Sequence, residues 1–200
     1  MRLAIFAQGQ RLRARLAIRL IGFKARTKPD DIARIILYRP TFFGRFFMRA
    51  IREVMRGPSE WSIGERELFA AFVSRRNSCT FCSGVHSHVA TLALNQPVSL
   101  DDLDDWATTQ FSEPVKATLG VLAKLAGSHG ESIHEELAVA RAAGVSDGAL
   151  IDAIYVAFVF NTINRMADVF GASYEGDEGR RLTAAALYDD GYQVPGFFLR

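Results

Sequence analysis

The chain has few cysteines and no long hydrophobic run. Only two of its 200 residues are cysteine, whereas a small secreted protein held together by disulfides has more, at wider spacing. No apolar run reaches the roughly 18 to 20 residues that a transmembrane helix needs. We therefore expect a soluble, cytoplasmic protein without a transmembrane segment, whose two cysteines are reactive or bind a metal.

Acidic residues are absent from residues 1–28, which form a basic N-terminal arm with eight lysine and arginine residues. Because the whole chain has 24 basic and 22 acidic residues, residues 29–200 carry a net charge of −6. Such an arm fits an acidic partner, a nucleic acid or a membrane surface. We favour instead an amphipathic helix that lies across the protein or a neighbouring subunit, and we expect no nucleic-acid partner. Its apolar stripe is supplied by Leu12, Leu16, Ile18, Leu20 and Ile21.

Residues 29–200 have the pattern of one helical domain. Ser62 and Glu65 form a capping box for a helix that ends near Arg76, and Ser146 caps a long helix that Gly171 ends. Apolar spacings of three and four predict further helices at 30–38, 41–56, 79–93, 99–108, 112–126 and 132–143. No stretch alternates as a strand does, and the tail at 173–200 is predicted to be irregular. The predicted fold class is an all-α, single-domain bundle.

The two cysteines occur as Cys79 and Cys82, at the start of a predicted helix that Asn77 and Ser78 can cap. Residues three apart on a helix lie close enough for a disulfide, and the positive end of the helix dipole favours a thiolate there. His86 follows one turn after Cys82 on the same face, where it can accept the thiol proton. The spacing places a nucleophile, a resolving thiol and a base on one surface.

Two other interpretations of the cysteines remain open. They can be small core residues, although both fall at the spacing of a redox pair. Alternatively, Cys79, Cys82, His86 and His88 can supply the four ligands of a zinc site. We disfavour zinc because the two histidines are two residues apart on a helix and point away from each other.

Glu67 stands twelve positions before Cys79, and the order Glu-x11-Cys-x-x-Cys-x-x-x-His resembles the signature of the alkylhydroperoxidase D (AhpD)-like proteins in the carboxymuconolactone decarboxylase superfamily. The surrounding residues are similar to the peroxidase-related branch of that superfamily. These are Glu60-Trp61-Ser62, Glu65-Arg66-Glu67-Leu68, Asn77-Ser78-Cys79 and Phe160-Asn161-Thr162-Ile163-Asn164-Arg165. The resemblance covers roughly residues 39–171 and implies an AhpD-like helical bundle.

The resemblance also implies roles for four residues. Cys82 attacks the peroxide and becomes a sulfenic acid, and Cys79 condenses with it to a disulfide. Glu67 and His86 serve a proton relay. A thiol reductant, in the best-known members a dihydrolipoyl protein, then reopens the disulfide. No metal or organic cofactor is implied, and assembly into a homo-oligomer is expected through the aromatic-rich helix at 41–56 and the long C-terminal helix.

Phe81 departs from the family pattern, because the signature protein has a further relay histidine directly before the second cysteine. An apolar ring does not transfer protons but excludes water. The alternatives are therefore a thiol–disulfide oxidoreductase with a non-peroxide substrate, or a non-catalytic helical oligomer. Ring-lactone decarboxylation is disfavoured, since that branch typically lacks the cysteines.

Overall fold

The computed structural model describes residues 1–29, 31–127 and 132–193, and all regular elements in these ranges are helical. The α-helices are α1 (Ile5–Gln8), α2 (Leu12–Ala25), α3 (Asp31–Tyr38), α4 (Arg45–Arg56), α5 (Ile63–Arg76), α6 (Thr80–Leu94), α7 (Leu100–Asp104), α8 (Glu113–Gly127), α9 (His134–Ala142), α10 (Asp147–Phe170) and α11 (Gly176–Asp190). A π-helical turn, Pro40–Gly44, precedes α4, and a 3-10 turn, Trp106–Thr108, follows α7. The predicted all-α class is confirmed.

Local capping signals set the helix ends where the sequence places them. The capping box at Ser62 is confirmed: its hydroxyl oxygen accepts the Glu65 amide at 3.2 Å, and the Glu65 carboxylate accepts the Ser62 amide at 2.8 Å. Ser146 accepts the Ala149 amide at 3.0 Å and begins α10. Gly171 ends α10 with φ of 65°, a left-handed conformation that costs glycine little.

Three predicted elements differ from those observed. The helix predicted at 41–56 begins with the π-helical turn, and the one predicted at 99–108 divides into α7 and a 3-10 turn. The irregular tail predicted at 173–200 is wrong at residues 176–190, where α11 forms. α11 packs against α6, where Ala184 is fully buried beside Val85 and Val89. Burial of this face stabilises a helix that the polar composition does not indicate. Positions 30, 128–131 and 194–200 lie outside the described residues.

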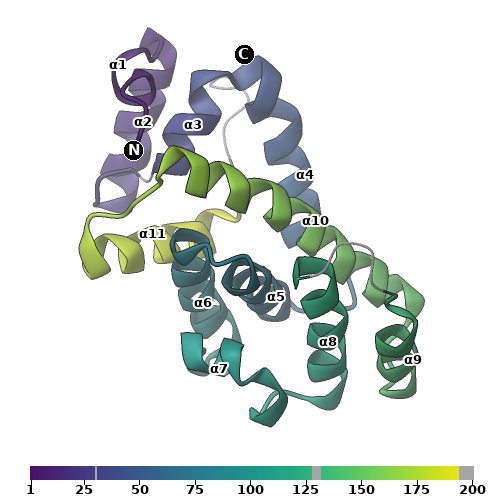
Figure 1. The fold of residues 1–200 in the computed structure, drawn as a ribbon. Coiled ribbons are helices and arrows are strands. Elements are labelled where there is room, and N and C mark those ends of the chain that lie inside the picture. The colour runs from purple at the N-terminus through teal and green to yellow at the C-terminus, as the bar shows by residue number, and fades with distance from the viewer. Residues whose placement is uncertain (30, 128–131, 194–200) are drawn as a thin grey trace.

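The bundle is built around the antiparallel pair of α5 and α6 (Figure 1). The long helix α10 crosses over this pair and also packs against α4 and α8, while α9 packs on α8. α11 lies along α6 on the side away from α8, and α2 packs against both α3 and α11. The C-terminal helix α11 thus packs directly on α6, which carries Cys82, and α2 packs in turn on α11.

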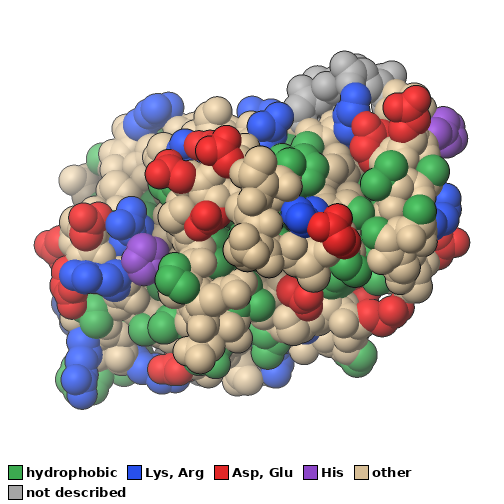
Figure 2. All heavy atoms as spheres, turned by 90° about the horizontal axis from the view of Figure 1, so that it is seen from below, with side chains coloured by type: hydrophobic (Ala, Val, Ile, Leu, Met, Phe, Trp, Pro, Cys, Tyr) green, Lys and Arg blue, Asp and Glu red, His purple; other side chains and the backbone are tan. Residues whose placement is uncertain are grey.

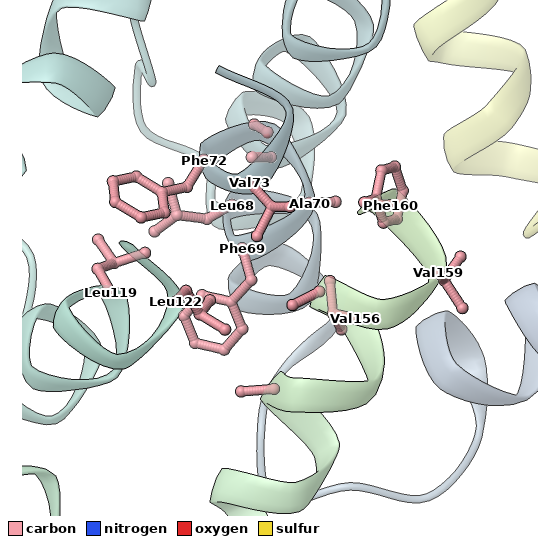
Figure 3. Packing of buried hydrophobic residues seen from close by; sticks show 14 of the residues in the cluster. Leu68, Phe69, Ala70, Phe72, Val73, Leu119, Leu122, Val156, Val159 and Phe160 are labelled. Carbon is pink, nitrogen blue, oxygen red and sulfur yellow. The ribbon is translucent and has the colours of Figure 1, made fainter. Parts of the chain in front are cut away.

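The core lies where α5 meets α8 and α10 (Figure 3). Leu68, Phe69 and Phe72 of α5 are at most 1% exposed and point toward Leu119 and Leu122 of α8. On the other side of α5, Val156, Val159 and Phe160 of α10 complete the cluster. At about 1.5 to 3 kcal/mol for each large apolar side chain buried, this cluster holds α5, which carries Glu67, rigidly in place.

The arm buries only part of the predicted stripe, since Ile18 and Ile21 face inward and the leucines do not. α2 buries Ala14, Ala17 and Ile18 against α3, whereas Leu12 is 82% and Leu16 50% exposed. Alanines let the two helices approach closely, so the smaller side chains lie inward and the leucines outward. The division of the chain into an arm at 1–28 and a domain from 29 remains a prediction.

Helix α10 is long and apolar enough to cross a membrane by length and composition. Half of its most apolar stretch is buried inside the structure, and the core helix of a soluble protein can have the same length and composition. The absence of a transmembrane segment therefore remains a prediction.

Figure 2 shows the molecule from below, and on this face acidic and basic side chains are mixed over the described surface.

Candidate active site

The cysteine pair lies at the turn from α5 to α6. Cys79 is the N-cap residue of α6, and Cys82 lies in its first turn. Both cysteines are reduced, with Cys79 0% and Cys82 3% exposed. The expected proximity of the two residues is present, and the N-terminal end of the helix dipole points toward them.

The tight turn before the pair is held by α10 rather than by a side-chain cap. Ser78 has φ of 59°, and the Cys79 amide donates to the Ser74 carbonyl at 2.9 Å. The Asn77 side-chain amide donates to the side-chain oxygen of Asn161 in α10 at 2.7 Å and ties the turn to that helix. The predicted cap at Asn77 and Ser78 is therefore wrong, since no side-chain cap hydrogen bond opens α6.

Glu67 is fully buried on α5, and its carboxylate is surrounded by donors. Its Oε2 lies 2.7 Å from His86 Nδ1, and its Oε1 lies 2.7 Å from Nη2 of Arg56 at the end of α4. The hydroxyl of Tyr192 donates to the same carboxylate, at 2.9 Å from Oε1 and 3.1 Å from Oε2. Donors from the end of α4, from α6 and from the residues after α11 thus converge on one buried anion.

These donors decide the protonation state of the Glu67 carboxylate. Burial alone raises the pKa of Glu67, but the hydrogen bond and charge of His86, together with Arg56, outweigh it and lower the pKa below its ordinary value. The carboxylate is therefore ionised at neutral pH. An anion of this kind orients and stabilises a neighbouring imidazole, and it does not itself carry the proton.

His86 lies between this anion and the cavity beside Cys82. Because its Nδ1 faces the Glu67 carboxylate, Nδ1 carries the hydrogen, and in the neutral form of the ring Nε2 holds the lone pair of a base. The ring packs edge-on against Phe160 of α10, with centroids 4.6 Å apart. The imidazole is thus fixed in both tautomer and orientation.

Tyr192 follows α11 in a left-handed turn, with φ of 58° at Gly191 and 64° at Tyr192 itself. Positive φ is strained for an aromatic residue and is often found at functional sites. Burial and the neighbouring Glu67 charge raise the pKa of the Tyr192 phenol well above its usual 10.0. The phenol therefore stays protonated and serves as a hydrogen-bond donor.

Phe81, between the two cysteines, stacks on Tyr174 with ring centroids 4.2 Å apart and planes 9° from parallel. The Tyr174 hydroxyl also donates to the Phe81 carbonyl oxygen. The position that carries a relay histidine in the signature protein is therefore part of an apolar wall.

An apolar cavity of about 150 Å³ lies in front of Cys82 and His86. Its wall comes from α2, α3, α4, α6, α10 and α11, and it includes Phe81, Tyr174 and Tyr192. Cys82 and His86 line this cavity, whereas Cys79 is fully buried and does not. The cavity gives a small molecule direct access to the second cysteine and to the histidine.

Sequence reasoning placed Cys79, Cys82, His86 and Glu67 but missed Arg56 and Tyr192. Arg56 shares no sequence motif with the cysteines, and Tyr192 lies in the tail that was predicted to be irregular. His88 faces the Gly84 carbonyl, 3.1 Å from its Nδ1. Within the described ranges, no group of three or more histidine, cysteine, aspartate or glutamate residues is arranged to hold a metal ion.

Comparison with known proteins gives matches among solved structures. No protein-family model and no curated protein matches the sequence. The alkylhydroperoxidase AhpD core of an uncharacterized peroxidase-related protein from Ralstonia eutropha JMP134 is similar with a TM-score of 0.73 and 20% identity, over 87% of this chain and 92% of that one. An uncharacterized peroxidase-related protein from Silicibacter sp. TM1040 gives 0.72 and 20%, over 84% and 87%. The helices that hold the cysteine pair, the buried glutamate and the histidine thus follow a known architecture, and the chain has the fold of the alkylhydroperoxidase AhpD core.

Proposed function

We propose that this chain is a thiol-dependent peroxidase of the AhpD-like, peroxidase-related branch of the carboxymuconolactone decarboxylase superfamily. The observation that carries the proposal is the shared cavity of Cys82 and His86, with His86 oriented by the ionised, buried Glu67. This order of thiol, imidazole and carboxylate is the arrangement that activates a cysteine nucleophile. The fold and the Glu-x11-Cys-x-x-Cys-x-x-x-His spacing support the same conclusion.

The first step begins when His86 Nε2 takes the proton of the Cys82 thiol. The thiolate attacks one oxygen of the peroxide, so that an S–O bond forms while the O–O bond breaks. His86 returns the proton to the departing alkoxide or hydroxide, which leaves as an alcohol or water. Cys82 is oxidised to a sulfenic acid by two electrons, and the peroxide is reduced by the same two.

The second step closes the disulfide. The Cys79 sulfur attacks the Cys82 sulfur, the S–O bond breaks, and the hydroxyl leaves as water with the proton of Cys79. A dithiol reductant, such as a dihydrolipoyl group, then restores both thiols by exchange and becomes a disulfide itself. Such cycling requires a reducing compartment, so we place the protein in the cytoplasm.

A peroxide-consumption assay tests this function. Purified protein is supplied with dithiothreitol or dihydrolipoamide and then with hydrogen peroxide, cumene hydroperoxide or tert-butyl hydroperoxide. We expect consumption that is proportional to protein concentration. If no peroxide is consumed above background while the protein reduces disulfides such as that of oxidised lipoamide, the function is thiol–disulfide exchange instead.

Replacing Tyr192 with phenylalanine removes one hydrogen bond to the buried carboxylate while the ring stays in place. A hydrogen bond to a charged group contributes about 1.5 to 3 kcal/mol, and we expect a loss of stability of that size. Because the pKa of Glu67 then rises, the acid limb of the pH dependence of kcat/KM should move to higher pH. Tyr188→Phe on α11, where the ring is 43% exposed, is the control that should change neither quantity. An unchanged pH profile for Y192F would show that the phenol has no part in positioning Glu67.

We also propose that the chain assembles with copies of itself. Ile151, Tyr155 and Phe158 form an apolar stripe on the outer face of α10 and are 49%, 54% and 67% exposed. A stripe at this helical spacing is typical of a helix–helix interface. We expect Phe158→Asp to lower the mass measured by light scattering from that of an oligomer to that of a monomer of 22.2 kDa. The same mass for the wild-type chain and for F158D would refute assembly through α10.

A further inference from the structure

A row of four arginines runs along one face of α4 toward the site. Arg45, Arg49, Arg52 and Arg56 follow one another at intervals of four, three and four residues, which places them on a single helix face. Arg56, at the inner end, pairs with Glu67 and lies over the Tyr192 ring at 4.8 Å. The three outer arginines are exposed, and among the described residues no carboxylate pairs with any of them.

These outer arginines line a groove of about 610 Å³ between α2, α4 and α11. The other charged residues of the groove are Lys24 and Asp190, which pair with each other. The three arginines therefore leave the groove strongly positive. Guanidinium groups bind carboxylates through two parallel hydrogen bonds, so a groove of this kind fits an anionic head group.

The basic groove continues into the apolar cavity at Cys82. Ile21, Met48 and Tyr192 line both spaces. The cavity, at about 150 Å³, equals in volume the roughly 150 Å³ apolar cavity that binds one benzene molecule in an engineered protein. It therefore holds a short length of a single alkyl chain and is too small for the two chains of a membrane phospholipid.

We infer that this protein binds single-chain aliphatic carboxylates, with the alkyl chain in the cavity beside Cys82 and the carboxylate on Arg45, Arg49 and Arg52. Because the alkyl chain lies beside Cys82, the substrate is a hydroperoxide of such a carboxylate. This identification of the substrate rests on the proposed function. The binding site itself does not rest on it. The substrate hydroperoxide is reduced to the corresponding hydroxy acid by the two-electron step described above.

Calorimetry with the full-length, reduced protein measures the binding of decanoate, which contains no peroxide group. We expect saturable one-to-one binding, and we expect decan-1-ol, which has the same chain length without the charge, to bind at least tenfold more weakly. The double variant Arg49→Gln/Arg52→Gln should also lose at least tenfold in affinity for decanoate. Arg19→Gln is the matched control, because Arg19 is exposed on α2 outside the groove lining. Equal affinity of the wild-type chain and the double variant would overturn the inference.

The rate at which the Cys82 thiol is alkylated shows whether the alkyl chain of decanoate lies beside it. In the Cys79→Ser variant, Cys82 is the remaining thiol, and we expect decanoate at saturation to slow its reaction with iodoacetamide at least tenfold, measured by mass spectrometry. Decanoate that binds without protecting Cys82 would place the site elsewhere. If the protein binds anionic vesicles but does not bind free decanoate, its partner is a membrane surface, and the inference is likewise overturned.

Turnover separates this inference from the proposed function. For a fatty-acid hydroperoxide we expect Arg49→Gln/Arg52→Gln to raise KM at least tenfold and to leave the consumption of uncharged cumene hydroperoxide unchanged. Arginine-dependent decanoate binding without any peroxide consumption would refute the peroxidase function and leave the binding site standing. Normal consumption of cumene hydroperoxide without decanoate binding would refute the carboxylate site alone.

Discussion

Cys82→Ser is expected to lower peroxide consumption by about 10³-fold or more, because a hydroxyl at this position replaces the attacking thiolate. Serine is close in size to cysteine, and Cys82 is only 3% exposed, so the fold should survive the change. The measurement is the rate of peroxide loss with dithiothreitol as reductant, together with circular dichroism to verify that the helices remain.

Cys79→Ser is the matched control for this result. It keeps the attacking thiol and removes only the resolving one, so a single turnover should still occur. The sulfenic acid on Cys82 should then accumulate and be trapped by dimedone, which mass spectrometry detects. If the two variants behave in the opposite way, and Cys79 is the cysteine that carries the sulfenic acid, the assignment of the two roles is wrong.

Glu67→Gln is expected to have the largest effect on stability. The substitution removes the charge that faces Arg56 while keeping the shape, and Glu67 is fully buried. Removing one partner of a buried ion pair costs about 3 to 5 kcal/mol, which for a chain of this length lowers Tm by roughly 10 °C. We expect this loss in thermal unfolding, along with a large loss of kcat because His86 loses the anion that fixes its tautomer.

Two further measurements separate the charge from the packing at Glu67. Exposed Glu53→Gln on α4 should leave Tm unchanged. The double variant Arg56→Gln/Glu67→Gln should recover part of the lost stability, since it removes the guanidinium that is left without a counter-charge. If the double variant is as unstable as the sum of the single ones, the ion pair does not contribute as described.

The same carboxylate predicts how stability depends on pH. The folded-state pKa of Glu67 is lower than its unfolded value, so its contribution is fully present above the unfolded pKa of 4.5 and is lost as pH falls through the folded pKa. Tyr192 has the opposite sign: its raised pKa gives a contribution that is present below its unfolded value of 10.0 and is lost as the pH rises toward the folded pKa. In E67Q the acid-induced loss of stability should be smaller than in the wild-type chain, as measured by urea unfolding at pH 3 to 7.

Features that depend on neighbouring residues could be predicted from the amino-acid order alone. The helix beginnings at Ser62 and Ser146 were predictable because a serine or glutamate side chain bonds to backbone groups within one turn. The proximity of Cys79 and Cys82 is likewise a matter of helical spacing. Glu67 and His86 are 19 residues apart, and their contact was expected only from the resemblance to a known family.

The surroundings of the buried carboxylate depend instead on long-range packing. Tyr192 lies 125 residues from Glu67 and reaches it because α11 packs on α6, a contact that no local pattern indicates. Arg56 becomes a counter-charge because the packing of α4 against α5 and α10 places its end beside Glu67. The cavity is formed by six helices from across the chain, so its shape depends on packing rather than on periodicity. Local hydrogen bonds therefore determined where α5 and α10 begin, while long-range packing determined the ionisation of Glu67, by bringing His86 and Arg56 to it, and the space in front of Cys82.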